Sequence, residues 1–486
     1  MKNNLLSRFN RTFKDSSIYA LSSLLNSGIS FLLLPVLTFY YDANEYGTYS
    51  LIMTIVVILG GLFYFGASSS YARFIYDQES KEHKIKIFSR TVNLSLVGGM
   101  AMILITIIFG KNLSYFLFES SDYFLHILLA SISSVFGFFV SILHVVFQFD
   151  KSPIKLLIIS FIGITLNFLI TYILLVYYDY GILAPILGIL SCNILITFYL
   201  IYHYAKFYSL RIKINFDSNF LRFGLQSSIG GILFYLVDYS DRIMINRILS
   251  TDEVGIYSLG YKLGFIINII LVIPFSQAWA PIKMEFINDN RQNEFTSNII
   301  SYYFLIGILL IFISTLFGSN FFDLVFVNRD FEGYLKIFPV IMSSIFLYGT
   351  INMTNIGLYK EVKLKYQNIV MLLALIINIL INLLYLNKYG ILIAAYSTLV
   401  TYALIAFAVT IISNKFLFIK IEKLRVISLL IVMISFLLIN SFTEIIINLS
   451  FSHKLLILSL FLISIYSTWL NKKEKHIINK LVTRSL

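Results

Sequence analysis

Long apolar runs recur along the whole chain, and they restrict its fold more than any other feature of the sequence. Of the 486 residues, 58% are hydrophobic and only 13% are charged, against roughly 45–50% and about 25% in soluble domains. A helix needs roughly 20 apolar residues to cross a hydrocarbon core about 30 Å thick. The sequence therefore predicts an all-α polytopic membrane protein with about fourteen transmembrane helices, and it excludes a water-soluble fold.

Polar and charged breaks between the apolar runs place the expected helices. Their ranges are 16–40, 48–72, 87–110, 123–148, 153–177, 180–204, 220–248, 255–281, 296–318, 335–359, 366–386, 389–414, 425–446 and 453–471. The first run is too long for the apolar core of a signal peptide, so we expect it to remain as the first helix.

The distribution of basic residues predicts the orientation of these helices. Lys and Arg accumulate in the short cytoplasmic loops of membrane proteins. With a cytoplasmic N-terminus, the inside segments hold 29 of the 37 basic residues and the outside loops hold six. Both termini are therefore predicted to be cytoplasmic. The net charge of +12 has the same origin and suits an anionic membrane surface, with no sign of nucleic-acid binding.

An internal repeat predicts the architecture. Residues 45–51 read EYGTYSL and residues 253–259 read EVGIYSL, while YGILA at 180–184 is matched by YGILI at 389–393. The two offsets, 208 and 209 residues, agree, which indicates two six-helix copies in the same orientation. Such copies pack around a pseudo-two-fold axis along the membrane normal and enclose a central cavity.

The repeat also sets the expected domain boundaries. These are a cytoplasmic segment 1–15, an N-lobe 16–205, a linker 206–219, a C-lobe 220–414, a C-terminal helix pair 425–471 and a cytoplasmic tail 472–486.

Ionisable residues inside apolar runs are the main candidates for a functional site. Asp238, Asp241 and Arg242 lie in the seventh predicted helix, and Lys262 lies in the eighth. Such groups are costly at membrane depth, so they normally face a bundle interior or a water-filled cavity. Asp238 and Arg242 are four residues apart and can pair on one helical face. Snorkelling of Arg242 to the outer boundary is the alternative.

The repeat offset shows that this cationic cluster belongs to one copy only. Subtracting 208 from Arg242 and Lys262 leads to Leu34 and Thr54. Two further residues are candidates in the first copy. Arg73 can line a cytoplasmic mouth or anchor the inner helix end, and Pro35 can act as a hinge or as a static kink of the first helix.

Other classes of chemistry have no motif in this chain. Neither a phosphate-binding G-x-x-x-x-G-K-[ST] loop nor an H-E-x-x-H or G-x-S-x-G motif occurs. The six histidines are scattered and Cys192 is the only cysteine, so we expect no metal site, no cofactor and no catalytic residue.

The chain resembles the polysaccharide flippases of the multidrug/oligosaccharidyl-lipid/polysaccharide exporter superfamily. In the first copy the resemblance lies in SSIYAL at 16–21, FLLLP at 31–35 and EYG at 45–47. In the second copy it lies in the segments DR at 241–242, EVGIYS at 253–258 and QAWAP at 277–281, together with Lys262.

This resemblance implies a V-shaped pair of lobes of twelve core helices with two added, and no enzymatic activity. It implies translocation of undecaprenyl-diphosphate-linked oligosaccharides across the bacterial cytoplasmic (inner) membrane by alternating access, for surface polysaccharide such as O-antigen. The expected partners are this substrate and membrane lipids, with a polysaccharide polymerase and chain-length proteins as further candidates. Arg and Lys bind phosphate well, which agrees with a lipid diphosphate.

Two other functions stay open at this point. One is a cation-coupled exporter of small molecules from the same superfamily. The other is a polytopic glycan polymerase or ligase, although those enzymes carry their catalytic groups on a large loop or soluble domain that this sequence lacks.

Overall fold

The computed structural model describes most of the chain as helices. It covers residues 31–75, 77, 80–149, 152–204, 218–277, 279, 292–325, 331–361, 363, 365–419, 421–443, 449–470 and 474–475. Within these residues there is no β-strand, and thirteen helical segments are long and apolar enough to cross a membrane. The predicted class is confirmed. A further apolar helix, Phe31–Tyr40, begins the described part and is the end of the predicted first helix.

Six labelled helices follow in the first half. They are α2 (Ala43–Phe63), α3 (Ala67–Phe74), α4 (Lys81–Phe118), α5 (Phe124–Phe149), α6 (Pro153–Val176) and α7 (Leu183–Tyr204). The predicted ranges agree with α5, α6 and α7 to within about three residues, whereas α4 is longer than expected at both ends.

The second half and the C-terminal pair contain the remaining elements. They are α8 (Ser218–Ile248), α9 (Thr251–Gly264), the π-helix η2 (Asn268–Val272), α11 (Gln292–Val325), α12 (Tyr334–Gly349), α13 (Ile351–Thr354), α14 (Ile356–Lys360), α15 (Lys365–Tyr389), α16 (Ile391–Asn414), α17 (Lys423–Thr443), α19 (Phe451–Ser464) and the π-helix η4 (Ile465–Trp469).

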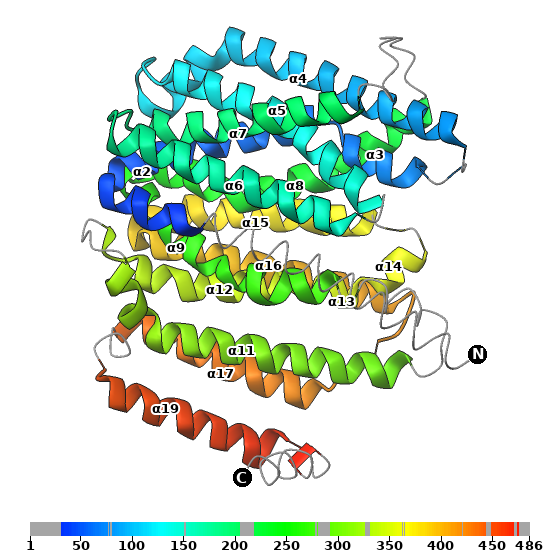
Figure 1. Cartoon of the computed structure of the whole chain (residues 1–486). Helices are drawn as coiled ribbons and strands as arrows, with labels where there is room; N and C mark the ends of the chain where they lie inside the picture. The colour runs from blue at the N-terminus through cyan, green and yellow to red at the C-terminus, as the bar shows by residue number, and fades with distance from the viewer. Residues whose placement is uncertain are drawn as a thin grey trace.

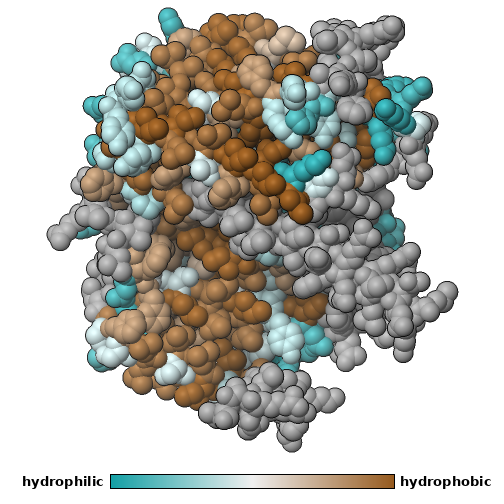
Figure 2. All heavy atoms as spheres, in the orientation of Figure 1, coloured by the Kyte–Doolittle hydropathy of each residue, from teal (hydrophilic) through white to brown (hydrophobic). Residues whose placement is uncertain are grey.

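The long helices lie roughly parallel to one another, with α4 at one edge of the molecule and α19 at the opposite edge (Figure 1). The face drawn in Figure 2 carries hydrophobic residues across its middle, and hydrophilic residues gather toward the two ends of the helices. This distribution is the one that a membrane requires of a helical bundle. Helix α2 packs against α9, and α8 packs against α15.

Polar caps start the two repeat-related helices α2 and α9. The Asp42 carboxylate accepts a hydrogen bond from the Glu45 backbone N–H at 2.7 Å, and the Glu45 side chain accepts one from the Asp42 N–H. The Ser250 hydroxyl oxygen caps α9 by accepting from the Glu253 N–H at 3.3 Å. Such caps satisfy backbone groups that have no partner in the first turn. Asp42 and Ser250 are 208 residues apart, so the repeat extends to the caps.

One predicted helix, 48–72, is wrong as a continuous element. The chain breaks between α2 and α3, where Phe65 and Gly66 have φ values of 52° and 62°, a left-handed conformation that ends a helix. A Cβ on Gly66 would lie 2.2 Å from the carbonyl oxygen of Gly224 in α8. The break therefore lets α3 approach α8, where the Ser70 hydroxyl donates to the Phe220 carbonyl at 2.9 Å.

Two other predicted helices are also interrupted. The range 335–359 is divided into α12, α13 and α14 by the short breaks at Thr350 and Asn355. The range 255–281 begins as α9 and passes through η2. Irregular helical turns of this kind are tolerated at membrane depth where neighbouring helices satisfy the backbone.

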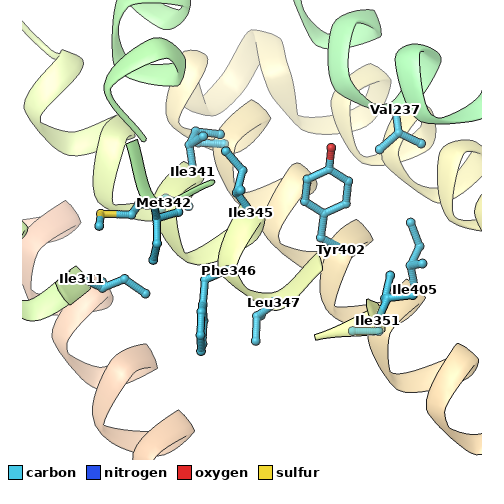
Figure 3. Close-up of a cluster of buried hydrophobic side chains, with 14 of the residues drawn as sticks. Val237, Ile311, Ile341, Met342, Ile345, Phe346, Leu347, Ile351, Tyr402 and Ile405 are labelled. Atoms are coloured by element: carbon cyan, nitrogen blue, oxygen red, sulfur yellow. The ribbon is translucent and has the colours of Figure 1, made fainter. Parts of the chain in front are cut away.

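The largest apolar core lies in the second half. Side chains of α12, among them Ile341, Ile345 and Phe346, fill the space toward α11 and α16 (Figure 3). In the same view the hydroxyl of Tyr402 points toward the helix that carries Val237. This tight packing fixes α8 against α16 and so positions the polar residues described below.

The domain boundaries stay a prediction. The segments 1–15, most of the linker 206–219 and most of the tail 472–486 lie outside the described residues.

Candidate functional site

Arg242 is buried on α8, and three tyrosine rings surround its guanidinium. Its Nη1 donates to the backbone carbonyl of Asp238 at 2.9 Å, and its Nε donates to the Ser258 hydroxyl at 3.3 Å. The guanidinium carbon lies 4.7 Å from the ring centroid of Tyr239 and 4.6 Å from that of Tyr261. Cation–π contacts of this kind stabilise a desolvated cation. Only 6% of the Arg242 surface is exposed, so this side chain does not snorkel to a boundary here.

Asp241 lies at the centre of a polar network inside the second half. Its carboxylate accepts hydrogen bonds from Tyr257 at 2.8 Å, Asn382 at 2.7 Å and Thr398 at 2.5 Å, and its exposed fraction is 0%. These donors come from α9, α15 and α16. One carboxylate therefore ties four helices together through neutral donors.

Asp238 belongs to the same interior. Its carboxylate accepts hydrogen bonds from the hydroxyls of Tyr261 and Tyr402, and 6% of its surface is exposed. The expectation that this carboxylate pairs with Arg242 is wrong. Among the described residues, the guanidinium contacts the Asp238 backbone carbonyl and forms no ion pair with either aspartate. Neither aspartate therefore forms an ion pair with Arg242 that an anionic ligand would have to displace.

Lys262 differs from Arg242 in its exposure. The side chain is exposed although it lies within the membrane-spanning segment that contains α9, and it makes no hydrogen bond or ion pair with any described residue. It lies one helical turn after Ser258, which accepts from Arg242, so the two cations approach the same face of α9. An unpaired cation at membrane depth is costly unless water or an anion solvates it.

The two candidates from the first half lie apart from this cluster. Arg73, near the end of α3, is exposed and pairs with Asp77 at 2.9 Å. Such an exposed i,i+4 pair suits an anchor at the helix end, and the structure gives Arg73 no contact with Arg242 or Lys262. Pro35 lies inside the helical segment Phe31–Tyr40, and its role as a hinge stays a prediction.

Helices α2 and α9 touch through glycines that are 208 residues apart. A Cβ on Gly47 would lie 2.0 Å from the Thr251 carbonyl oxygen, and a Cβ on Gly255 would lie 1.9 Å from the Ala43 carbonyl oxygen. The missing side chain of each glycine therefore lets the backbone of the other helix come close, and a larger residue would clash with it.

Polar side chains repeat the same symmetric pattern along this α2–α9 contact. The hydroxyls of Ser50 and Ser258 lie 2.7 Å apart, and the Asn44 amide donates to the Asp252 carboxylate at 3.2 Å. Each residue thus meets its own counterpart in the other copy, which is the mark of a contact across a two-fold axis. Because Ser258 also accepts from Arg242, the buried cation lies directly behind this contact.

A cavity of about 440 Å³ lies between α2, α3 and α5 on one side and α8 on the other. Its lining consists of Val57, Gly60, Gly61, Tyr64, Gly66, Ser69, Ser134, Gly137, Phe138, Ser141, Ser227, Ser228, Gly231, Ile232 and Tyr235. None of the predicted site residues is in this lining. Tyr235 lies about two turns before Arg242 on α8. The cavity and the buried cation are therefore neighbours along the same helix.

The sequence predicts a central cavity and names Arg242, Lys262, Asp238 and Asp241, but it missed the hydrogen-bond partners of the two carboxylates and the residues that line the cavity. Asn378 and Asn382, four residues apart in an apolar run, were a usable signal, because uncharged amides at membrane depth also need partners. The lining residues gave no signal, since serines and glycines within apolar runs are as typical of close helix packing as of a binding surface.

Comparison with known proteins places the chain in a family. The family model described as "Polysaccharide biosynthesis protein" matches residues 12–287, more than half of the sequence. The chain belongs to the polysaccharide biosynthesis protein family. An uncharacterized membrane protein of Haemophilus influenzae is 26% identical over 283 residues, which are 56% of this chain and 65% of that protein. The match thus spans slightly less than two thirds of this relative.

Solved structures show the fold of this family member. The lipid II flippase MurJ in an inward closed conformation superposes with a TM-score of 0.70 at 16% identity, over 94% of this chain and 98% of that one. An inward-facing multidrug resistance MATE transporter of the MOP superfamily superposes with a TM-score of 0.61 at 11% identity, over 85% of this chain and 95% of that one. The chain thus shares the fold of these two proteins.

Proposed function

We propose that this protein translocates undecaprenyl-diphosphate-linked oligosaccharide units from the cytoplasmic to the outer leaflet of the bacterial inner membrane, for surface polysaccharide biosynthesis. The observation that carries the proposal is a pair of cations: Arg242 is buried behind the contact between α2 and α9, and Lys262 is exposed one helical turn after Ser258 on α9. The two cations complement the negative charge of a lipid diphosphate, which the guanidinium binds as a planar fork and the ammonium as a point charge.

The position of Arg242 supports alternating access as the mechanism. Arg242 donates a hydrogen bond to the hydroxyl of Ser258, and this hydroxyl is hydrogen-bonded to Ser50 of the other half. Separation of α2 from α9 would break the serine contact and uncover the guanidinium. If the N-terminus is cytoplasmic, as the basic residues predict, the contact between α2 and α9 closes the space between the halves on the outer side. The contact between α3 and α8 then closes it on the inner side. Rocking one half against the other would open each side in turn.

The test is complementation of a deletion strain with Arg242→Ala, Lys262→Ala and the double variant. A hydrogen bond to a charged group contributes about 1.5–3 kcal/mol, which corresponds to roughly a 10- to 100-fold change in affinity. We therefore expect each single variant to lower surface glycan at least about tenfold. Arg242→Lys should retain part of the activity, because it keeps the charge and loses the fork.

Arg247→Ala is the matched control. Arg247 lies on the same helix, is exposed and contacts the ring of Phe116, so its loss should leave surface glycan unchanged. All values are normalised to the amount of protein in the membrane. Wild-type glycan from the double variant would reject these two cations as the substrate site. Unchanged surface glycan in the deletion strain itself would instead favour a cation-coupled exporter of small molecules.

A further inference from the structure

The cavity between the two halves is lined by uncharged residues, in contrast to the cationic site at Arg242 and Lys262. Among the fifteen lining residues that the structure describes there is no Asp, Glu, Lys, Arg or His. Seven lining residues carry a hydroxyl group: Tyr64, Ser69, Ser134, Ser141, Ser227, Ser228 and Tyr235. The inter-lobe space is therefore divided into a cationic zone at Arg242 and a neutral, hydroxyl-rich compartment.

Several of these hydroxyls are available to a ligand. Those of Ser69, Ser134, Ser227 and Tyr235 make no hydrogen bond with any described residue. A hydroxyl both donates and accepts, as does each hydroxyl of a sugar, so the two surfaces can satisfy each other in many orientations. An unpaired polar group that a ligand covers is costly, so a purely apolar occupant would fit this surface poorly.

The remaining lining residues suit the shape of a sugar. Gly60, Gly61, Gly137 and Gly231 line the cavity together with Tyr64 and Tyr235, and aromatic faces can cover the C–H groups of a sugar ring. The volume of about 440 Å³ lies in the range of roughly 300–1,000 Å³ typical of small-molecule sites. A short oligosaccharide fits this description.

We propose that this compartment receives the sugars of the lipid-linked substrate and selects uncharged sugars over sugars that carry a carboxylate or phosphate. The inference rests on the proposed function, because it needs the diphosphate of the same molecule at Arg242 and Lys262. An anionic sugar would enter a space whose described lining holds no cation, and a desolvated charge without a partner is unfavourable. A neutral sugar meets no such penalty.

The test uses the purified full-length chain in liposomes with two synthetic undecaprenyl-diphosphate oligosaccharides of equal length. One carries neutral hexoses only, and in the other a uronic acid replaces the second sugar. An impermeant glycosidase measures how fast the sugars reach the far leaflet. We expect the neutral substrate to be translocated at least about tenfold faster. Equal rates, or a faster anionic substrate, would overturn the selectivity and leave the proposed function intact. Translocation of neither substrate above protein-free liposomes would overturn both.

Variants of the lining make the assignment specific to this cavity. A Cβ on Gly231 would meet no atom within 4 Å, so Gly231→Leu should fill the compartment without disturbing the helix packing and slow the neutral substrate. Ile229→Phe, on an exposed part of the same helix outside the lining, should leave the rate unchanged. Ser228→Lys should raise the rate of the anionic substrate relative to the neutral one. Wild-type selectivity in both Gly231→Leu and Ser228→Lys would reject this cavity as the sugar site.

Discussion

The two copies of the repeat share a backbone contact but differ in the chemistry behind it. Gly47 and Gly255 occupy equivalent places in α2 and α9 and approach the opposite backbone in the same way. The counterparts of Arg242 and Lys262, however, are Leu34 and Thr54, and both are buried. The contact between the halves is therefore symmetric, whereas the cationic pair of Arg242 and Lys262 occurs in the second half and has no counterpart in the first.

The first way to break this comparison is to enlarge the two glycines. A Cβ at Gly47 or Gly255 would lie about 2 Å from a backbone oxygen, and backbone cannot move aside as a flexible side chain can. Overpacking in a dense interior costs about 1–3 kcal/mol or more. We expect Gly47→Val and Gly255→Val each to abolish complementation and to lower the Tm of the purified protein by similar amounts.

Gly231→Val is the control for both glycine variants, because its added atoms enter open space and should leave the Tm near that of the wild type. A large loss for only one of the two α2–α9 glycines would contradict the symmetric contact.

The second way to sharpen the comparison is to exchange a cation for its first-half counterpart. Lys262→Thr should lower transport about 10- to 100-fold at unchanged abundance, for the reason given for alanine. Adding Thr54→Lys to the Lys262→Thr variant should not restore transport. Thr54 is fully buried, so a lysine there would be an unpaired charge without access to the substrate. Restored transport in the double variant would show that the two halves are chemically equivalent.

The third and smallest effect concerns the buried carboxylate of Asp241. Asp241→Asn replaces one acceptor oxygen by an N–H₂ group that faces other donors, so we expect a loss of about 1–3 kcal/mol of stability and a lower Tm. Asp252→Asn is the matched control, since that carboxylate lies at the start of α9 and accepts from the exposed Asn44 side chain. An unchanged Tm for Asp241→Asn would show that the network does not stabilise the second half.

The sequence predicts the helices and the repeat well because both depend on local patterns. Apolar runs give the span of α8 to within two residues, and the matched segments at 45–51 and 253–259 contain the glycines and serines that meet in the α2–α9 contact. The break at Phe65 and Gly66, which lets α3 approach α8, was missed because the range 48–72 reads as one continuous run in the sequence.

The candidate site was predicted in part. The cost of a charge at membrane depth identifies Arg242 and Lys262 from sequence, but the spacing of Asp238 and Arg242 suggested an ion pair that does not form. The carboxylates find neutral donors on α15 and α16 instead, more than 140 residues away along the chain. No pattern within one helix can predict such partners.

The most direct test of the central claim is to identify what accumulates when the protein is removed. In a deletion strain, lipid extracts analysed by mass spectrometry should show an undecaprenyl-diphosphate oligosaccharide that an impermeant reagent cannot label in intact spheroplasts. The wild-type gene should remove this pool, and the Arg242→Ala, Lys262→Ala double variant should not. Absence of any such pool, or its removal by the double variant, would contradict translocation of a lipid diphosphate by these two cations.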